Sequence, residues 1–146
     1  MASSGGVKSF TTVPVFVDTN VAIYALGRDS GKKARALELL ADTPIASSQV
    51  INETLSVLMG KQGFSRQEAY DIADALMHLM AVAPVTEGTV RDAMSLGLRY
   101  GLNHWDALIV ATALTTGCHT LYTEDMQDEQ VFDARLTVKN PFVANA

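Results

Sequence analysis

Short runs of β-branched and aromatic residues alternate along this chain with longer stretches in which apolar residues recur at helical spacing. The short runs end at polar residues or proline and predict strands, which fall at 13–17, 44–46, 81–85, 118–122 and 135–138. The longer stretches predict helices, which fall at 20–27, 29–42, 48–59, 65–80, 86–100 and 104–116. Strands that alternate with helices favour a mainly parallel sheet with helices on both faces. The chain is therefore expected to form an α/β domain.

The same periodicity predicts which helix residues point into the core. In the helix at 29–42, the expected apolar face consists of Ala34, Leu37, Leu40 and Ala41. The sequence Ser65-Arg66-Gln67-Glu68 predicts a capping box at the start of the helix at 65–80. The helix at 104–116 is apolar almost throughout, so its Trp105 is expected to anchor packing. Stacking of Trp105 on a nucleic-acid base is the alternative.

Composition places the chain among folded, single-domain proteins. Its 146 residues correspond to one domain, and 48% hydrophobic with 18% charged residues is enough for a core. Cys118 is the only cysteine, which excludes an intrachain disulfide and fits a reducing compartment. No apolar run reaches the roughly 18 residues of a membrane span, and residues 1–12 lack the apolar core of a signal peptide. We expect a flexible lead-in at 1–12, a domain at 13–146, and a cytoplasmic location.

Four acidic residues occur where the predicted fold can bring them together. Asp18 and Asp125 each follow a predicted strand, and parallel strands end at one edge of a sheet, where α/β proteins bind ligands. Asp106 lies in the first turn of a helix that can begin near that edge. Glu53 lies on the inward face of its helix, where an uncompensated carboxylate costs several kcal/mol. Each acid alone has an ordinary explanation as a cap, first-turn, turn or solvent-facing residue, so their joint placement is the more specific signal.

A cluster of these carboxylates would need a cation. Two carboxylates about 4 Å apart repel by roughly 4 kcal/mol at an effective dielectric constant near 20, so three or four together must take up protons or bind cations. Oxygen ligands without cysteine or histidine favour Mg²⁺ or Mn²⁺. Such an ion in an open acidic pocket suits phosphodiester hydrolysis, because it activates a water and stabilises charge on the phosphate. Thr19, Asn20 and Thr123 are placed to hydrogen-bond the carboxylates or the phosphate.

The net charge bears on whether the substrate is a nucleic acid. The chain carries −5 overall, whereas proteins that bind phosphate backbones are typically basic. Cations bound by the four acids would leave −1 on the remainder of the chain. Basic residues also gather locally, at Arg28, Lys32, Lys33 and Arg35. The charge therefore weakens the case for a nucleic-acid substrate without excluding one.

Four blocks of the sequence together resemble a known family. They are VFVDTNVAIYAL, the lone Glu53 in its helix, GLNHWDALIVATAL, and LYTEDMQ followed by a terminal NPF, and they span residues 13–143. Their order and spacing are similar to those of the PIN domain, and most of all to the ribonuclease toxins of bacterial VapBC-type toxin–antitoxin pairs. The resemblance implies a three-layer α/β/α fold and a single-strand endoribonuclease that depends on Mg²⁺ or Mn²⁺. It also implies a homodimer and a small antitoxin partner whose tail enters the active-site groove.

The resemblance also implies which residues form the site. The family's metal-binding acids correspond to Asp18, Glu53, Asp106 and Asp125. Asn20 corresponds to a polar member of the first block, and Thr123 to the hydroxyl residue before the last acid. Some members have a further acid where this chain has Gln127, and Asp128, one position later, is not counted as a ligand. The occupancy of a second metal site is therefore left open.

The leading hypothesis is a metal-dependent endoribonuclease. In it Asp18 is the central metal ligand, Asp106 and Asp125 complete the metal site, and Glu53 binds metal or orients the attacking water. The alternative is a non-catalytic PIN-fold module that binds RNA or protein, which the negative charge and Gln127 favour. A third hypothesis is a nuclease whose substrate is DNA flaps or structured DNA instead of RNA. Binding of divalent cations that depends on Asp106 would separate the enzyme from the module.

Overall fold

The computed structural model describes residues 13–143, and within them it has six helices and one six-stranded sheet. The strands are β1 (Val15–Val17), β2 (Ile45–Ser47), β3 (Ala81–Ala83), β4 (Thr120–Tyr122), β5 (Val131–Phe132) and β6 (Leu136–Lys139). The helices are α2 (Thr19–Ala25), α3 (Ser30–Ala41), α4 (Ser48–Met59), α5 (Arg66–Leu79), α6 (Glu87–Tyr100) and α7 (His104–Thr115). The lead-in expected at 1–12 lies outside the described residues. No helix in the described range is long and apolar enough to cross a membrane.

The strand order of the sheet creates a switch point beside its central strand. The order is β3-β2-β1-β4-β6-β5, and every neighbouring pair is parallel except β5 with β6. From β1 the chain moves outward to β2 and β3, and then returns to β4 on the other side of β1. The carboxyl ends of β1 and β4 therefore flank the position where α/β sheets bind ligands.

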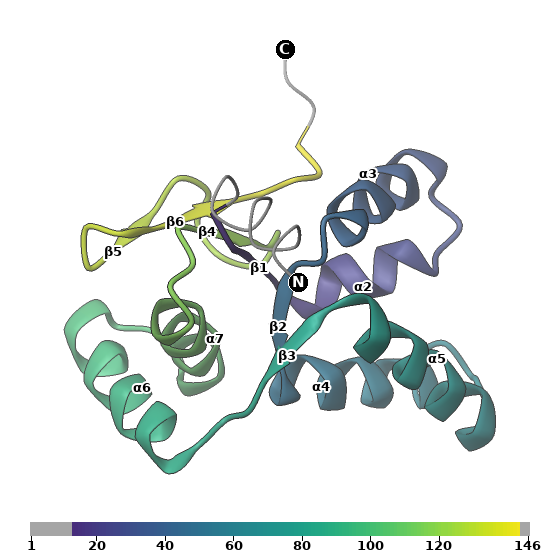
Figure 1. Cartoon of the computed structure of the whole chain (residues 1–146), viewed down its shortest axis with the longest axis horizontal. Helices are drawn as coiled ribbons and strands as arrows, with labels where there is room; N and C mark the ends of the chain where they lie inside the picture. Colours follow the sequence, from purple (N-terminus) through teal and green to yellow (C-terminus); the bar gives the residue numbers. More distant parts are fainter. Residues whose placement is uncertain (1–12, 144–146) are drawn as a thin grey trace, which may run out of the picture.

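Helices cover both faces of the sheet. Figure 1 shows α2, α3, α4 and α5 on one side of the strands and α6 with α7 on the other. This separation follows from the strand order, because right-handed crossovers that run in opposite directions along a sheet place their helices on opposite faces. The α/β/α arrangement around a mainly parallel sheet, expected from the sequence, is confirmed.

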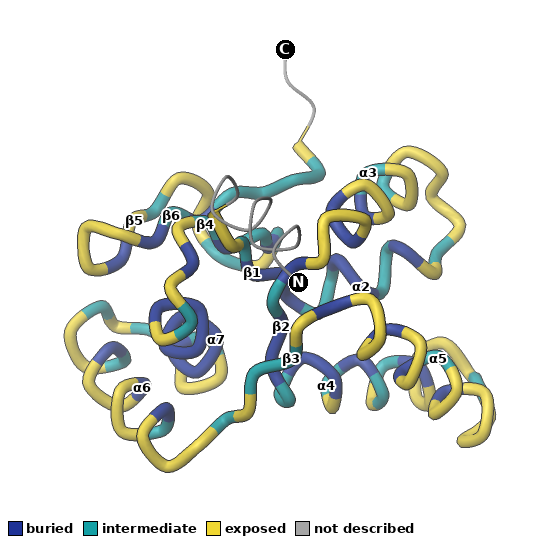
Figure 2. Tube along the Cα trace, in the orientation of Figure 1, coloured by how far each residue is buried: buried dark blue, intermediate teal, exposed yellow. Residues whose placement is uncertain are grey.

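The core lies against the central strands and surrounds α7. Phe16, Leu121 and Val138 of the parallel strands are fully buried. Residues 107–114 of α7 are all buried, and Figure 2 shows this helix as an almost continuous dark blue coil. By contrast, α5 and α6 each expose an outer side, coloured yellow in Figure 2. Burial on all sides explains why the sequence of α7 is apolar almost throughout.

The ends of α5 and α6 follow the local sequence signals. The Glu68 N–H donates to the Ser65 side chain at 3.1 Å, and the Ser65 N–H donates to the Glu68 carboxylate at 2.9 Å. This is the predicted capping box. The helix α6 ends at Gly101, whose φ of 69° lies in the left-handed region that glycine adopts without strain.

Three details differ from the sequence prediction. The helix α3 buries Ala36, Leu39 and Leu40, while Leu37 of the predicted face is 48% exposed. Both faces carry apolar residues, and the core covers the one that contains Ala36 and Leu39. Trp105 is 66% exposed and so is not a packing anchor. The strand β5 is absent from the prediction because its two residues are extended only through antiparallel pairing with β6.

Candidate active site

Asp18 lies at the end of β1, between the sheet and the start of α2. Its backbone N–H donates to the Tyr122 carbonyl at 3.1 Å, which continues the pairing of β1 with β4 beyond the last strand residue. One carboxylate oxygen caps α2 by accepting from the Thr19 N–H at 2.7 Å. The other accepts from the Thr123 hydroxyl at 2.9 Å. Asp18 is therefore the helix cap that the ordinary explanation anticipates, but it is also only 5% exposed and joined to the neighbouring strand.

The Thr123 hydroxyl connects three of the predicted site residues. It donates to Asp18 and accepts from the Asn20 side-chain amide and from the Asp125 backbone N–H, both at 3.1 Å. One donor and two acceptor positions are all that a hydroxyl offers, so it is fully used. The Asn20 amide also donates to the Asp125 carboxylate at 3.1 Å. The end of β1 and the turn after β4 thus form one hydrogen-bonded unit.

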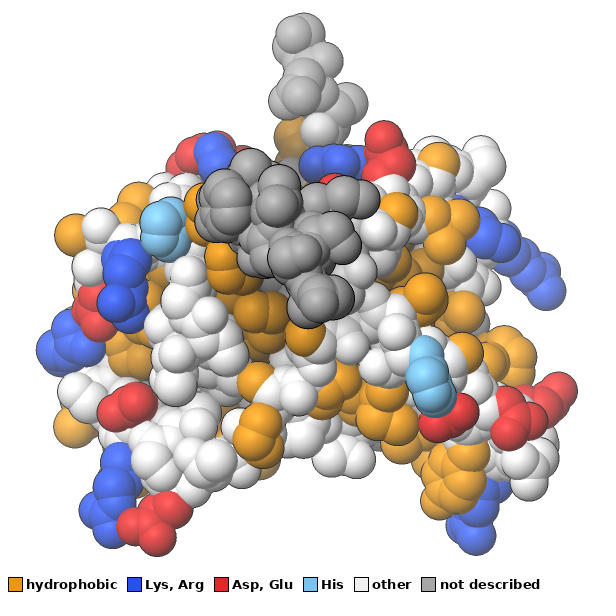
Figure 3. Space-filling model, in the orientation of Figure 1, with side chains coloured by type: hydrophobic (Ala, Val, Ile, Leu, Met, Phe, Trp, Pro, Cys, Tyr) orange, Lys and Arg blue, Asp and Glu red, His pale blue; other side chains and the backbone are white. Residues whose placement is uncertain are grey.

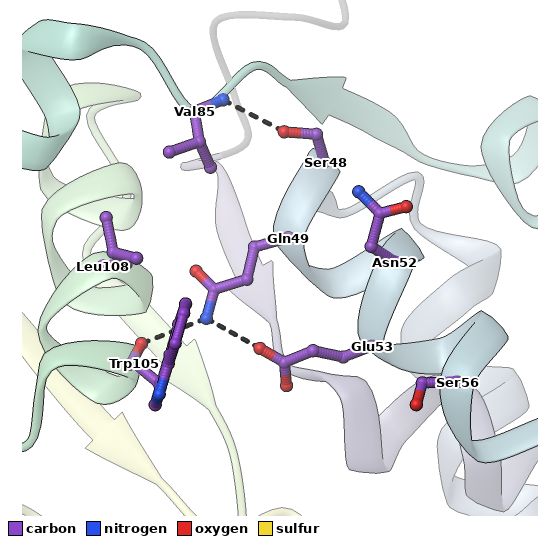
Figure 4. Close-up of a pocket in the computed structure, with 8 residues that line it drawn as sticks. All are labelled: Ser48, Gln49, Asn52, Glu53, Ser56, Val85, Trp105 and Leu108. Atoms are coloured by element: carbon purple, nitrogen blue, oxygen red, sulfur yellow. Dashed lines mark hydrogen bonds between the residues drawn. The ribbon is translucent and has the colours of Figure 1, made fainter. Parts of the chain in front are cut away.

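Glu53 reaches the same edge of the sheet from α4. It is half-buried, on the inward side of the helix as its spacing predicts. One of its oxygens accepts from the Gln49 side-chain amide at 2.7 Å, and the other lies 3.4 Å from the Thr19 hydroxyl. The Gln49 amide also donates to the Trp105 backbone carbonyl at 3.1 Å. Figure 4 shows Gln49 lying between Glu53 and Trp105, so this side chain ties α4 to the start of α7.

Asp106 is held in the first turn of α7 by the residue that caps the helix. The Asn103 side chain accepts from the Asp106 backbone N–H and donates to the Asp106 carboxylate, each at 2.9 Å. Asp106 is half-buried. The reciprocal bonds fix both the backbone and the side chain of Asp106, so the carboxylate has one preferred orientation.

The pKa values show that the four carboxylates share one electrostatic environment. Burial raises the pKa of Asp18 from 3.8 to about 6, against the lowering effect of its hydrogen bonds, and the charges of Glu53 and Asp125 add to the rise. Burial also raises the pKa of Asp106, and Asp125 and Glu53 again contribute, while Asn103 opposes them. Carboxylates that repel one another in this way favour proton uptake or a bound cation.

Basic side chains of the described residues pair with acids elsewhere on the molecule. Lys32 pairs with Glu124, Arg99 with Asp133, and Lys139 with Glu129. Figure 3 shows blue and red side chains around the rim of one face, with hydrophobic and uncharged side chains between them. Within residues 13–143, no lysine or arginine forms an ion pair with any of the four site acids.

The chemical type of the donor atoms in the site fits a hard divalent cation. All are oxygens, the atom type that Mg²⁺ and Mn²⁺ prefer. The Asn20 carbonyl oxygen is in addition buried and has no hydrogen-bond partner among the described residues. In the same part of the chain, no three Asp, Glu, His or Cys side chains form a group that could hold an ion by themselves. This arrangement suits Mg²⁺, which typically binds one or two carboxylates and keeps water or substrate oxygens as its other ligands.

Two residues of the site, Gln49 and Asn103, are absent from the sequence prediction. Both support an acid on their own helix, Gln49 four residues before Glu53 and Asn103 three residues before Asp106. These are the spacings at which helix side chains meet and at which caps contact the first turn. The spacing could therefore have identified Gln49 and Asn103 from the sequence, but only after Glu53 and Asp106 had been recognised as site residues.

The profile of the PIN domain family matches residues 15–131, the part of the chain that carries all four acids and both central strands. The chain belongs to the PIN domain family. No protein of curated function matches it.

Several solved structures have the fold of this PIN domain. VapC20 of Mycobacterium tuberculosis, a Sarcin-Ricin loop cleaving toxin, is 21% identical, with a TM-score of 0.62 over 76% of this chain and 89% of that one. A toxin–antitoxin complex from Klebsiella pneumoniae is 22% identical, with a TM-score of 0.68 over 88% and 98%. VapBC2 of Rickettsia felis, bound to a DNA fragment from its promoter, is 20% identical, with a TM-score of 0.63 over 86% and 97%. At these identities the similarity concerns the fold.

Proposed function

We propose that this PIN domain is an endoribonuclease that depends on Mg²⁺ or Mn²⁺ and is the toxin of a toxin–antitoxin pair. The observation that carries the proposal is the convergence of four carboxylates from β1, α4, α7 and the turn after β4, without a basic partner among the described residues. RNA is the proposed substrate because a structure of similar fold belongs to a toxin that cleaves the Sarcin-Ricin loop.

In this proposal Asp18, Asp106 and Asp125 would hold the cation directly or through water, because the three side chains are not grouped closely enough to hold it by themselves. When bound, the cation supplies activation of a water and stabilisation of charge on the phosphate. Glu53 accepts a proton from the attacking water or orients it. The Thr123 hydroxyl and the Asn20 amide keep Asp18 and Asp125 in position, and Gln49 does the same for Glu53.

We further propose a second copy of the chain and a small antitoxin as protein partners. The structures of similar fold include toxin–antitoxin complexes. Large apolar side chains exposed on α5, namely Tyr70, Met77 and Leu79, offer a surface for such a partner.

A non-catalytic module that binds RNA or protein is the second candidate. Two observations favour it, namely the net charge of −5 and the lack, within residues 13–143, of three acids grouped tightly enough to hold an ion alone. Calorimetry separates the candidates. The enzyme is expected to bind Mn²⁺ with an affinity that falls when Asp106 is replaced by asparagine, whereas a module without a metal site shows no such binding.

The purified protein is expected to cut single-stranded RNA when Mg²⁺ or Mn²⁺ is present and to stop when EDTA is added. The physical reason is that without a cation the carboxylates repel the phosphate as well as one another. Gel analysis of a panel of RNAs, with DNA of the same sequences as comparison, measures this. Cleavage that persists in EDTA would exclude the metal-dependent mechanism, and intact RNA throughout the panel would favour the non-catalytic module.

Replacing Gln49 with leucine is expected to lower kcat by about 10- to 100-fold, the usual cost of removing a residue that orients a ligand. Leucine fills the same space but cannot donate to Glu53 or to the Trp105 carbonyl. The matched control is Gln67→Leu, which removes a hydrogen bond of the same type, to Asp71 four residues later on the exposed side of α5. Single-turnover cleavage rates of the two variants should differ widely, and equal rates would show that Gln49 does not position Glu53.

A further inference from the structure

A hollow of about 660 Å³ opens between α4 and α7, directly beside Glu53. Gln49, Asn52, Glu53 and Ser56 line it from α4, and Trp105 and Leu108 line it from α7 (Figure 4). Its volume lies within the roughly 300–1,000 Å³ of pockets that bind small molecules. Because Glu53 belongs both to this wall and to the acid cluster, a group in the hollow lies next to the proposed site of cleavage.

The α7 side of the hollow is formed by the Trp105 ring and the Leu108 side chain. Trp105 is 66% exposed although it belongs to the most deeply buried helix of the described chain. Its backbone is fixed by the hydrogen bond from Gln49 to its carbonyl, and in Figure 4 its ring stands at the mouth of the hollow, facing the α4 side chains. A large exposed ring in this place presents a π-face to whatever enters the hollow.

The α4 side of the hollow is polar but almost uncharged. The side chains on this side recur at the spacing of one helix face, at Gln49, Asn52, Glu53 and Ser56. Among the described residues that line the hollow, only Glu53 is charged. Among residues 13–143, no lysine or arginine lines the hollow to attract a phosphate. The wall therefore suits a neutral planar group with hydrogen-bonding edges, which is the chemistry of a nucleobase.

We infer that this hollow is a subsite for one base of a single-stranded RNA substrate, stacked on Trp105 with its edge toward Asn52 and Ser56. The inference rests on the proposed function and adds to it a point of substrate recognition. Stacking on an aromatic ring binds bases with little dependence on sequence, while amide and hydroxyl side chains at the edge can distinguish one base from another. The base so held belongs to a nucleotide beside the cleaved bond.

Intrinsic fluorescence tests the contact directly, because Trp105 is the only tryptophan of the chain. The full-length protein with Mn²⁺ is mixed with increasing amounts of short single-stranded RNA or of an abasic strand of equal length, and the emission is recorded before cleavage proceeds. Stacking is expected to quench the emission in a saturable way with the RNA and not with the abasic strand. Equal quenching by both strands, or none, overturns the subsite.

Binding of variants gives the second measurement. Trp105→Ala is expected to raise the Kd for the RNA about 5- to 100-fold, the range of a lost stacked base, and Trp105→Phe is expected to restore most of the affinity. The control is Leu98→Ala, which removes a large apolar side chain that is 89% exposed on α6 and should leave the Kd unchanged. An unchanged Kd for Trp105→Ala overturns the inference. Loss of binding to a protein partner by this variant, with RNA binding unchanged, would assign Trp105 to a protein interface and would overturn the inference as well.

These measurements can reject the subsite without rejecting the proposed function, and the reverse. If the protein cleaves RNA with a metal but Trp105→Ala has an unchanged Kd, the proposed subsite is wrong and the proposed nuclease activity stands. If quenching depends on the bases but the protein cuts no RNA, the subsite is supported and the proposed nuclease activity is wrong.

Discussion

Replacing Asp18 with asparagine is expected to lower the rate of RNA cleavage by about 100- to 1,000-fold. Asp18 is the one of the four acids that lies at the end of β1, and its charge interacts with those of Glu53 and Asp125, as the charge of Asp106 also does. Loss of its charge removes an interaction with the cation worth several kcal/mol, and each 1.36 kcal/mol changes a rate tenfold. The measurement is the single-turnover cleavage rate in saturating Mn²⁺.

Asp128→Asn provides the matched control for this experiment. Asp128 lies three residues after Asp125, is exposed, and accepts a hydrogen bond at 2.8 Å from the Asn140 backbone N–H, which asparagine can also accept. Its replacement should leave the rate near that of the wild type. If the folded Asp18→Asn protein cuts RNA as fast as the control, Asp18 has no role in the reaction.

Without divalent cations, the wild-type protein is expected to lose about 3 kcal/mol of stability relative to Asp18→Asn as the pH rises from about 4 to about 6. The native state holds the Asp18 proton up to a pKa of about 6, whereas the unfolded chain releases it near 3.8. Between these values the native state binds more protons, so the free energy of unfolding falls as pH rises, at 1.36 kcal/mol for each unit of difference. Asparagine has no such titration.

Urea unfolding curves in EDTA, recorded at several pH values for both proteins, measure this difference. Asparagine cannot accept from both Thr19 and Thr123, so its absolute stability also changes, and only the slope against pH reports on the charge. Adding Mn²⁺ near neutral pH should stabilise the wild type more than the variant, because a ligand that binds only the native state shifts unfolding. Parallel pH profiles would show that burial does not disfavour the Asp18 charge.

The placement of the acids at one edge of the sheet could be predicted from the sequence more readily than the hydrogen bonds that hold them there. Asp18 and Asp125 follow strands, and their placement at one edge follows from a parallel sheet. That β4 pairs with β1, and so brings Thr123 to Asp18, depends on strand order, which local patterns do not encode. The role of Gln49 in joining α4 to α7 likewise depends on the tertiary fold, because only the fold places the Trp105 carbonyl beside its amide.

The errors on α3 and α7 have one physical cause. Both helices have more apolar residues than one face requires, so periodicity alone does not decide which of them are buried. In α3, the core covers Leu39 and leaves Leu37 exposed. In α7, residues 107–114 are all buried, whereas Trp105 in the first turn is 66% exposed.

The hydrogen bond between Asp18 and Thr123 joins residues 105 positions apart. A chain emerging from the ribosome has made β1, α2 and α4 long before β4 exists to meet them. Any nascent or truncated product that stops short of residue 120 therefore lacks the partner strand that completes the acid cluster. The mutual repulsion of the carboxylates therefore arises only after β4 and Asp125 have been made, and shorter translation intermediates lack the assembled site.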